Sequence, residues 1–418
     1  MTTSQRAMLA ADLAERAFAG PIAGSLTPRR IGAEVELIPV ELHTGQRCSI
    51  DAEEGISTLP FLRRYGGRQG WGESCTSKGT PCFTLPTGGT LTFEPGGQLE
   101  YSSPACRSAS SLLALLRSVV IPLRAAAATE GIDLLAVGID PLNSAERAPM
   151  LIHAKRYQRM ADYLSRRGPA GARMMRQTAA FQVSVDFDDE PWLRWRVLNA
   201  ATPYVVAIFA NSPIYAGELT GHQSARADVW RNLDPARTGI PYDERAPVQA
   251  YLDFALAAPA ILLPTMDGEY RPLGEWLTRA NLSAEEWQDH LSTLFPEVRP
   301  RGHLELRSAD AIAPEWYAAP LALIVGILYD SRALRAAADL LPIPDLGLLE
   351  RAGRLGLHDS SIARTAVDLF ELALGGCAGL GSGYFHPADI EQARVYFERF
   401  TRRSRAPADD VIQDAIAA

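Results

Sequence analysis

The segment Ile31-Gly-Ala-Glu-Val-Glu-Leu-Ile-Pro-Val40 decides how the rest of the chain is interpreted. Apolar residues alternate with others along it, a pattern typical of a β-strand with one buried face. Glu34 and Glu36 are two positions apart, so both side chains project from the same face of this strand. Two adjacent carboxylates repel one another, and a half-buried pair therefore favours a bound cation such as Mg²⁺. The alternative is a face exposed to water, where charged residues mostly lie.

Two other segments carry acidic residues in related patterns. Glu94-Pro-Gly-Gly-Gln-Leu-Glu100 has the pattern of a strand, a tight glycine turn and a second strand, with a carboxylate at each end. An ordinary turn with charged flanks is the alternative. In His303-Leu-Glu-Leu-Arg307, Glu305 and Arg307 share one face. Such a pair suits a metal-binding carboxylate beside a phosphate-binding guanidinium, and it also suits a surface salt-bridge ladder.

The order of predicted elements indicates an α+β fold, with one sheet and helices segregated to one side of it. Strand patterns occur mainly in the first half and helical patterns in the second. The predicted strands are 31–40, 90–93, 98–102, 134–139, 179–186 and 302–307. The predicted helices are 108–130, 155–167, 192–211, 247–256, 283–293, 315–341, 360–374 and 387–402. Without repeats or long linkers, we expect a single catalytic domain over 1–418, with its core at about 28–330 and a helical C-terminal part at about 331–418.

Composition excludes several classes of protein. The 41 basic and 49 acidic residues give a net charge of -8 without a basic stripe, so nucleic acid is not an expected partner. Asp12 and Glu15 interrupt the N-terminal apolar pattern, and the longest apolar run, 316–329, is too short to span a bilayer. We therefore expect a cytoplasmic protein without a membrane partner.

The cysteine spacing and the absence of several common motifs exclude some kinds of active site. The spacing of the five cysteines, Cys48, Cys75, Cys82, Cys106 and Cys377, is neither zinc-like nor thioredoxin-like, and reduced thiols are expected. A redox pair of Cys75 with Cys82 is the alternative. The motifs GxxxxGK[ST], GxGxxG, GxSxG and HExxH do not occur. A bound nucleotide would therefore need metal and arginine, and not a glycine-rich loop, to hold its phosphates.

Taken together, these segments resemble the plant-type glutamate-cysteine ligase family, which many proteobacteria share and which is related in fold to glutamine synthetase. The resemblance extends from about residue 31 to 329. It is carried, in order, by 32–36, 94–100, 178–186 (TAAFQVSVD), 210–213 (ANSP), 226–230 (RADVW), 234–240 (DPARTGI) and 295–310 (FPEVRPRGHLELRSAD).

The resemblance implies a curved, mainly antiparallel sheet that forms a bowl, as in the glutamine synthetase and guanidino kinase-like catalytic fold. ATP would bind at one end and the amino acids at the other, with two or three Mg²⁺ ions between them. The implied metal ligands are Glu34, Glu36, Glu94, Glu100 and Glu305. The implied catalytic residues are Glu34, Glu36 and Arg307. Arg226, Arg299 and Arg307 would bind the glutamate α-carboxylate or the ATP phosphates, while Gln182 would contact metal or substrate or serve as a buried structural amide.

The implied reaction is the formation of γ-glutamylcysteine from glutamate and cysteine through a γ-glutamyl phosphate, the first step of glutathione biosynthesis. Tyr101-Ser102-Ser103-Pro104 and Ser308-Ala309-Asp310 depart from the family pattern near the expected substrate end, which leaves the acceptor amine open. A different acceptor, or a role in ergothioneine biosynthesis, is the first alternative. A non-catalytic relative that binds glutamate or nucleotide is the second. The protein is expected to be a monomer or a homodimer.

Overall fold

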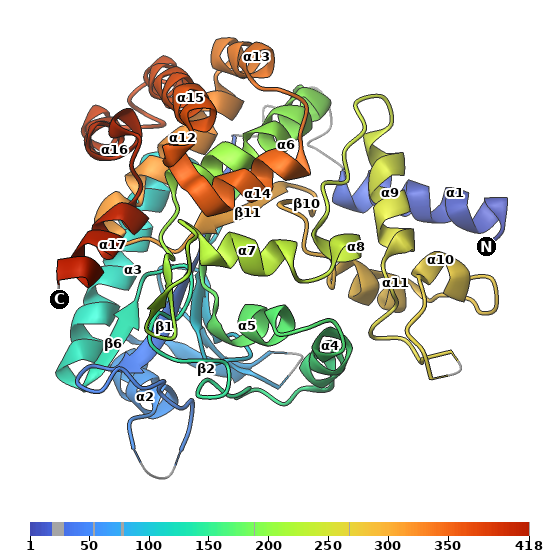
Figure 1. Ribbon diagram of the computed structural model, residues 1–418, viewed down its shortest axis with the longest axis horizontal. Coiled ribbons are helices and arrows are strands. Elements are labelled where there is room, and N and C mark those ends of the chain that lie inside the picture. The colour runs from blue at the N-terminus through green and yellow to red at the C-terminus, as the bar shows by residue number, and fades with distance from the viewer. Residues whose placement is uncertain (19–28, 53–54, 77–78, 188, 267, 418) are drawn as a thin grey trace.

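A computed structural model of the chain describes residues 1–18, 29–52, 55–76, 79–187, 189–266 and 268–417. Figure 1 shows α6, α12, α13, α15 and α16 on one side of the molecule and α4 and α5 on the opposite side, while α1, α9, α10 and α11 lie together at one end. The strands are β1 (Ile31–Glu41), β2 (Gly72–Cys75), β3 (Pro81–Thr84), β4 (Thr90–Phe93), β5 (Leu99–Ser102), β6 (Ile132–Leu135), β7 (Ala180–Val185), β8 (Ile214–Tyr215), β9 (Glu218–Leu219), β10 (Val298–Pro300) and β11 (Leu304–Asp310).

The helices fill most of the second half of the chain. The α-helices are α1 (Thr3–Asp12), α2 (Thr58–Gln69), α3 (Ala109–Thr129), α4 (Lys155–Ser165), α5 (Ala170–Gln177), α6 (Pro191–Ile208), α7 (Ala225–Arg231), α8 (Pro235–Thr238), α9 (Pro247–Ala257), α10 (Leu273–Trp276), α11 (Ala284–Leu291), α12 (Ala318–Tyr329), α13 (Ser331–Leu340), α14 (Leu346–Leu355), α15 (Ser360–Gly379), α16 (Pro387–Arg399) and α17 (Pro407–Ala417). A π-helical turn, η1 (Leu13–Ala17), and three 3₁₀ turns, η2 (Pro314–Trp316), η3 (Gly356–His358) and η4 (Thr401–Arg403), complete the set within the described residues.

The main sheet is open and antiparallel. Among the described residues it has nine strands in the order β10-β11-β7-β1-β5-β4-β3-β2, and β6 pairs with the second half of β1. All of these described pairings are antiparallel. The predicted combination of an antiparallel sheet with helices, the α+β class, is therefore confirmed.

The side chains of the central strand β1 point alternately to the two faces of the sheet. Its residues alternate between buried and half-buried as far as Leu37, as the sequence pattern predicts. Ala33, Val35 and Leu37 belong to the main hydrophobic core, whereas Glu34 and Glu36 point to the opposite face. The apolar face is covered by helices, and the other face is left for the candidate site.

The helix α3 is a core helix of this covering layer. Its 21 residues are long and apolar enough to cross a membrane by length and composition alone. However, Leu112, Leu116 and Leu123 are fully buried, and the helix packs on β1, β6 and α12. The helix thus contributes one apolar side to the protein core.

The helix α12 lies deeper still, because every one of its residues is buried. It crosses α15 where Gly326 faces the backbone of Ala373 and where Gly376 faces the backbone of Gly326. A Cβ atom at either glycine would overlap the facing carbonyl oxygen. The two helices can approach this closely only because neither position carries a side chain.

The structure differs from the predicted elements in several places, and three of these differences have a clear physical cause. The helix predicted over 315–341 is divided at Asp330, which leaves the helical conformation and caps α13 by accepting from the backbone N–H groups of Arg332 and Ala333. The strand predicted over 134–139 ends at Leu135, where pairing with β1 ends. The β2–β3 hairpin was not predicted, because the exposed Gly72–Cys75 strand has no apolar alternation.

Candidate active site

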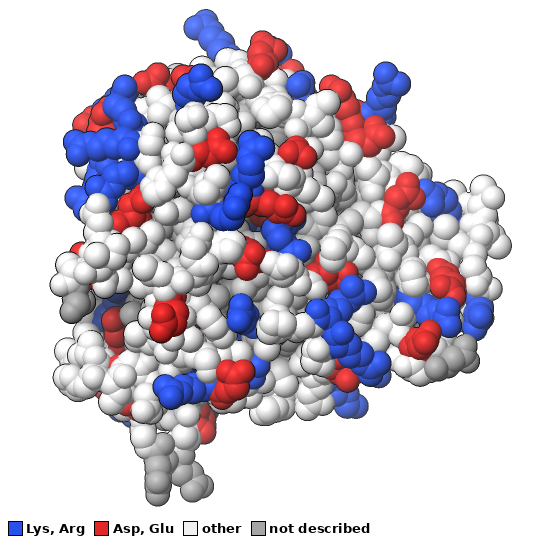
Figure 2. All heavy atoms as spheres, viewed as in Figure 1, with Lys and Arg blue, Asp and Glu red and all other residues white. Residues whose placement is uncertain are grey.

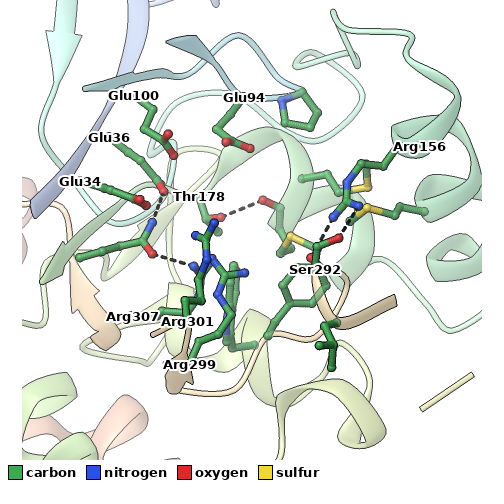
Figure 3. A pocket seen from close by; sticks show the side chains of 18 of the residues that line it. Glu34, Glu36, Glu94, Glu100, Arg156, Thr178, Ser292, Arg299, Arg301 and Arg307 are labelled. Atoms are coloured by element: carbon green, nitrogen blue, oxygen red, sulfur yellow. Dashed lines mark hydrogen bonds between the residues drawn. The ribbon is translucent and has the colours of Figure 1, made fainter. Parts of the chain in front are cut away.

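Four of the predicted carboxylates line one cavity of about 590 Å³ on the face of the sheet opposite the main hydrophobic core. Glu34 and Glu36 come from β1, Glu100 from β5, and Glu94 from the end of β4. In the strand register, Glu100 lies directly opposite Glu36. Figure 3 shows the four carboxylate groups gathered on one side of the cavity. Periodicity and turn geometry therefore bring these acids together as predicted.

The opposite wall of the cavity is made of arginines gathered around Glu305. Arg299 Nη2 lies 2.7 Å and 3.0 Å from the two carboxylate oxygens of Glu305, and Arg301 Nη1 lies 3.2 Å from Oε2. Arg307 Nη1 also donates to Glu305 Oε1. The Glu305 side chain is only 1% exposed. Three guanidinium groups around one carboxylate leave an excess of positive charge facing the acidic wall.

Gln182 connects the two walls. Its side-chain Nε2 donates to Glu36 Oε1 at 2.9 Å, and its Oε1 accepts from Arg307 Nη1 at 2.7 Å. The second Glu36 oxygen accepts from the backbone N–H of Ala180 at 2.8 Å. Because both the nitrogen and the oxygen of the amide form hydrogen bonds, the orientation of the Gln182 side chain is fixed. It therefore holds the side chains of Glu36 and Arg307 in place relative to one another.

A β-bulge in β11 shapes the arginine wall. The register between β11 and β7 shifts between Leu306 and Ala309, so Arg307 and Ser308 fall outside the regular ladder. The Arg307 N–H donates to Glu297 O at 2.9 Å, and the Ser308 hydroxyl donates to Glu297 Oε2 at 2.7 Å. At the bulge, Arg307 does not pair with β7. Its backbone bonds to Glu297 instead, and its side chain points toward Gln182.

Arg226, a predicted substrate-binding residue, lies behind this bulge and does not line the cavity. Its Nη2 donates to Arg307 O at 2.7 Å, and its Nη1 lies 3.8 Å from Asp310 Oδ1. Its guanidinium also stacks 4.9 Å from the ring of Trp230, which does line the cavity. Direct substrate binding by Arg226 stays a prediction, and the contacts described here support the backbone that carries Arg307.

The electrostatics of the two walls are opposite. Burial, together with Glu100 and Glu305, raises the pKa of Glu34 to about 8. Burial, together with Glu94 and Glu36, raises the pKa of Glu100 to about 8, and burial also raises the pKa of Glu36. Although burial opposes its ionisation, Arg299, Arg307 and Arg301 hold the pKa of Glu305 well below its usual range. The acidic wall therefore retains protons that a cation would displace.

The acidic wall fits a magnesium site in its chemistry. Mg²⁺ takes oxygen ligands and usually keeps several waters, so it needs only one or two protein carboxylates. Among the described residues, no three His, Cys, Asp or Glu side chains are close enough together to hold a metal ion. Glu34, Glu36, Glu94 and Glu100 thus offer an oxygen-rich wall without a complete cage.

Glu305 stands apart from that set. Both of its oxygens already accept from arginines. Its assignment as a metal ligand stays a prediction. The geometry favours a different role, in which the Glu305 carboxylate holds Arg299, Arg301 and Arg307 together.

Several cavity residues were not predicted. Arg156 on α4 donates to the hydroxyl and carbonyl oxygens of Ser292 at 2.7 Å and 2.8 Å, and it faces the cavity from a third side (Figure 3). Arg301 also lines the cavity, and its spacing of two from Arg299 was a signal in the sequence. The apolar part is lined by Tyr157, Met160, Met174, Met175, Trp230 and Phe295. These come from separate elements, and no local pattern would reveal them.

The thiols lie outside this cavity. In the β2–β3 register, Cys75 lies opposite Pro81 and Cys82 lies opposite Ser74, so the two cysteines do not face one another. Cys75 is exposed and Cys82 is buried. All five cysteines lie in the described part of the chain, and each is a free thiol there.

Surface charge is mixed on the face shown in Figure 2, where basic and acidic side chains are interspersed. This agrees with the scattered charges in the sequence.

Comparison with known proteins identifies the family. The open antiparallel sheet has the glutamine synthetase-like fold. The sequence profile of glutamate-cysteine ligase family 2 (GCS2) matches residues 30–374. The chain belongs to this family and is an enzyme of the glutamate-cysteine ligase class. The predicted resemblance is therefore confirmed.

The relatives show how far the similarity extends. The glutamate-cysteine ligase EgtA of Mycolicibacterium smegmatis is 32% identical over 349 residues, which cover 80% of this chain and 79% of the relative. The chloroplastic glutamate-cysteine ligase of Arabidopsis thaliana is 30% identical over 339 residues, which cover 74% of this chain and 61% of that protein. Because a plant relative is named as chloroplastic, the cytoplasmic location stays a prediction.

A solved structure shares the fold. The glutamate-cysteine ligase of Francisella tularensis, determined in complex with AMP, superposes with a TM-score of 0.55. The superposition covers 92% of this chain and 84% of that chain at 13% sequence identity.

Proposed function

We propose that the protein joins the γ-carboxylate of glutamate to the amine of cysteine and converts ATP to ADP and phosphate in the process. The observation that carries this proposal is the bipolar cavity, in which an acidic wall and an arginine wall face one another across Gln182. A reaction between two anions, a carboxylate and a triphosphate, needs this kind of electrostatic surrounding.

The reaction takes two steps because a carboxylate is a poor acyl donor. In the first step, an oxygen of the glutamate γ-carboxylate bonds to the γ-phosphorus of ATP, and the bond to the β-phosphate oxygen breaks and releases ADP. In the second step, the amine nitrogen of cysteine, having lost a proton, bonds to the acyl carbon. Inorganic phosphate leaves, and the nitrogen releases a further proton. No protein nucleophile is required, so the protein contributes positioning and electrostatics.

The arginine wall is the proposed binding surface for anionic groups. Guanidinium groups match phosphate and carboxylate oxygens in fork-like pairs. Arg299 and Arg307 are mostly buried, with side chains 14% and 12% exposed, so their field is little screened by solvent. Because Glu305 neutralises only one of the three positive charges, the wall retains the capacity to bind an anion.

Glu34, Glu36, Glu94 and Glu100 are the residues that would hold magnesium. When bound, the ion would neutralise the charge that builds up between the two reacting anions. The fixed hydrogen bonds from Ala180 and Gln182 orient the Glu36 carboxylate for this purpose.

The test is a steady-state assay of ADP release with glutamate, ATP, magnesium and a panel of acceptor amines. We expect cysteine to give the highest kcat/KM and mass spectrometry to detect γ-glutamylcysteine. A higher kcat/KM with another amine would show that this amine is the acceptor, which is the first alternative given by the sequence. Nucleotide binding without ADP release under any of these conditions would instead indicate a non-catalytic relative. The product's place in glutathione or ergothioneine biosynthesis is a separate proposal, for which metabolite analysis of a deletion strain is the test.

A further inference from the structure

The turn that carries Glu94 follows the end of β4. Within it, the backbone N–H of Glu94 donates to Gln98 O and that of Gly97 donates to Glu94 O, both at 2.8 Å. Gly97 has a φ of +82°, in the left-handed region that favours glycine. Figure 3 shows the Glu94 side chain beside Glu100 at the acidic wall. The position of Glu94 at this wall therefore depends on how the turn is fixed to the rest of the protein.

Arg47 fixes the middle of this turn. It lies on the segment that turns back after β1, where it forms an antiparallel bridge with Val40. Its Nη2 donates to Gly96 O at 2.6 Å and lies 3.5 Å from Arg176 O, in the last turn of α5. One guanidinium group thus joins the Glu94 turn to the end of a helix.

The turn lies close against α5 at Gly96. A Cβ atom added at Gly96 would lie 2.3 Å from Arg176 O, so a side chain at this position would push the turn away from the helix. The backbone of the turn is also bonded at Pro95, whose carbonyl oxygen accepts from Leu151 N at 2.7 Å. Of these two hydrogen bonds to the turn, the one from Arg47 has a charged donor, which makes it the stronger kind.

Burial of Arg47 is unfavourable for stability by itself. Its side chain is only 4% exposed, and its Nη1 lies 3.7 Å from Asp140 Oδ2, beyond hydrogen-bond distance. Within the described residues, Nε and Nη1 of Arg47 have no hydrogen-bond partner. Removing a guanidinium from water costs free energy, and an ion pair without a hydrogen bond offsets little of it. The hydrogen bond to the turn is therefore what distinguishes Arg47 from an apolar side chain of similar length.

We infer that Arg47 is a positioning residue for Glu94 and thereby sets the affinity of the acidic wall for a divalent cation. This inference rests on the proposed function, in which Glu94 would hold magnesium. Arg47 is not among the residues that line the cavity, so its effect on an ion there passes through the turn. Without the bond to Gly96 O, the turn would be less ordered, and binding of the ion would have to order Glu94 each time.

Binding of Mn²⁺ to the substrate-free protein tests the inference. Mn²⁺ prefers the same carboxylate oxygens as Mg²⁺, and the electron paramagnetic resonance signal of the free ion gives the Kd without turnover. Arg47→Met keeps the length of the side chain and removes the donor. We expect the Kd for Mn²⁺ to rise about tenfold in Arg47→Met and by a similar factor in Glu94→Gln. In the double variant the Kd should be no higher than in Glu94→Gln alone, because Arg47 acts through Glu94.

A second variant and a matched control separate positioning from stability. Arg47→Lys should fold because a positive charge remains near Asp140, but its single ammonium group cannot replace the guanidinium between Asp140 and Gly96 O, so its Kd should rise about threefold or more. The control is Arg194→Met. Arg194 is also buried, its Nε donates to Leu328 O at 3.0 Å, and neither residue lines the cavity. Its free energy of unfolding in urea should fall while the Kd for Mn²⁺ stays at the wild-type value.

The outcomes distinguish this inference from the proposed function. An unchanged Kd in the Arg47 variants, together with weaker binding in Glu94→Gln, would overturn the inference and leave the proposed function intact. Equal weakening in Arg194→Met, or a double variant that binds more weakly than Glu94→Gln, would also overturn it. An unchanged Kd in Glu94→Gln would instead refute the metal role of Glu94 in the proposed function, and the inference with it.

Discussion

Glu36 on β1 and Glu100 on β5 lie directly opposite one another, and both side chains line the cavity. Like charges at directly opposed positions destabilise a sheet, so this pair opposes folding unless a proton or a cation intervenes.

Glu34→Gln should lower kcat by at least about a hundredfold, because it removes one oxygen donor and one negative charge from the acidic wall while keeping the side-chain shape. The measurement is the initial rate of ADP release at saturating substrates. Glu41→Gln is the matched control on the same strand, since Glu41 bonds to Thr44 outside the cavity. Similar rates for Glu34→Gln and the wild type would remove Glu34 from the catalytic set.

The stability of the metal-free protein should fall as the pH rises from about 5 to 8. Burial and neighbouring carboxylates raise the pKa values of Glu34 and Glu100 to about 8, against an ordinary value of 4.5. Between these values the folded state holds protons that the unfolded chain has released, so raising the pH favours unfolding. Thermal melting across this range measures the effect.

Magnesium should reverse this trend. Because the cation competes with protons for the carboxylates, we expect the rise in Tm on adding Mg²⁺ to be larger at pH 8.5 than at pH 6. Glu100→Gln should reduce the dependence on pH. A magnesium effect that is equal at both pH values would contradict the assignment of the acidic wall.

Arg307→Lys should lower kcat/KM by about a hundredfold or more. Arg307 donates to both Gln182 and Glu305 through Nη1, and a lysine lacks the planar guanidinium whose remaining N–H groups would bind an anion. Arg63→Lys is the control, because Arg63 forms a fork with Glu73 on the surface. Equal losses in both variants would indicate a general effect of replacing arginine and not a role at the site.

Arg226→Met separates two roles for this residue. If Arg226 supports the bulge, its loss leaves the carbonyl oxygen of Arg307 without its donor, and the free energy of unfolding should fall by about 1–3 kcal/mol along with kcat. Urea unfolding and steady-state kinetics give both quantities. A higher KM for glutamate with unchanged stability would instead support the direct substrate contact that the family resemblance implies.

Oxidation should not regulate the enzyme through Cys75 and Cys82, because these residues do not face one another across the β2–β3 hairpin. The rate should be the same after treatment with a disulfide or with a thiol reductant, in the wild type and in Cys75→Ser. An inhibition by oxidant that Cys75→Ser abolishes would restore the alternative of a redox pair.

The periodic parts of the fold were predictable from the sequence. Alternation in β1, β4, β5 and β7 identified these strands to within about two residues, and α3 was identified equally closely. Alternation also assigns a residue to a face, which is why Glu34 and Glu36 were placed together. The division of the helix at Asp330 was missed because the apolar pattern continues across it, whereas the break depends on a capping side chain.

The partners of the site residues were less predictable. Periodicity shows that Glu305 and Arg307 share a face, but it does not show that Arg299 and Arg301 also bind Glu305. The β11 bulge, which redirects the backbone groups of Arg307, depends on Glu297 and Arg226 from other parts of the chain. Contacts between elements distant in sequence decide these features.

The crossing of α12 and α15 at Gly326 and Gly376 has a consequence in the living cell. No side chain can be added at this crossing without moving one helix away from the other. A Gly326→Ala allele would therefore reduce how much enzyme accumulates, through unfolding and degradation, while each surviving molecule keeps its normal Michaelis constants. Such an allele would appear in genetics as a dosage defect.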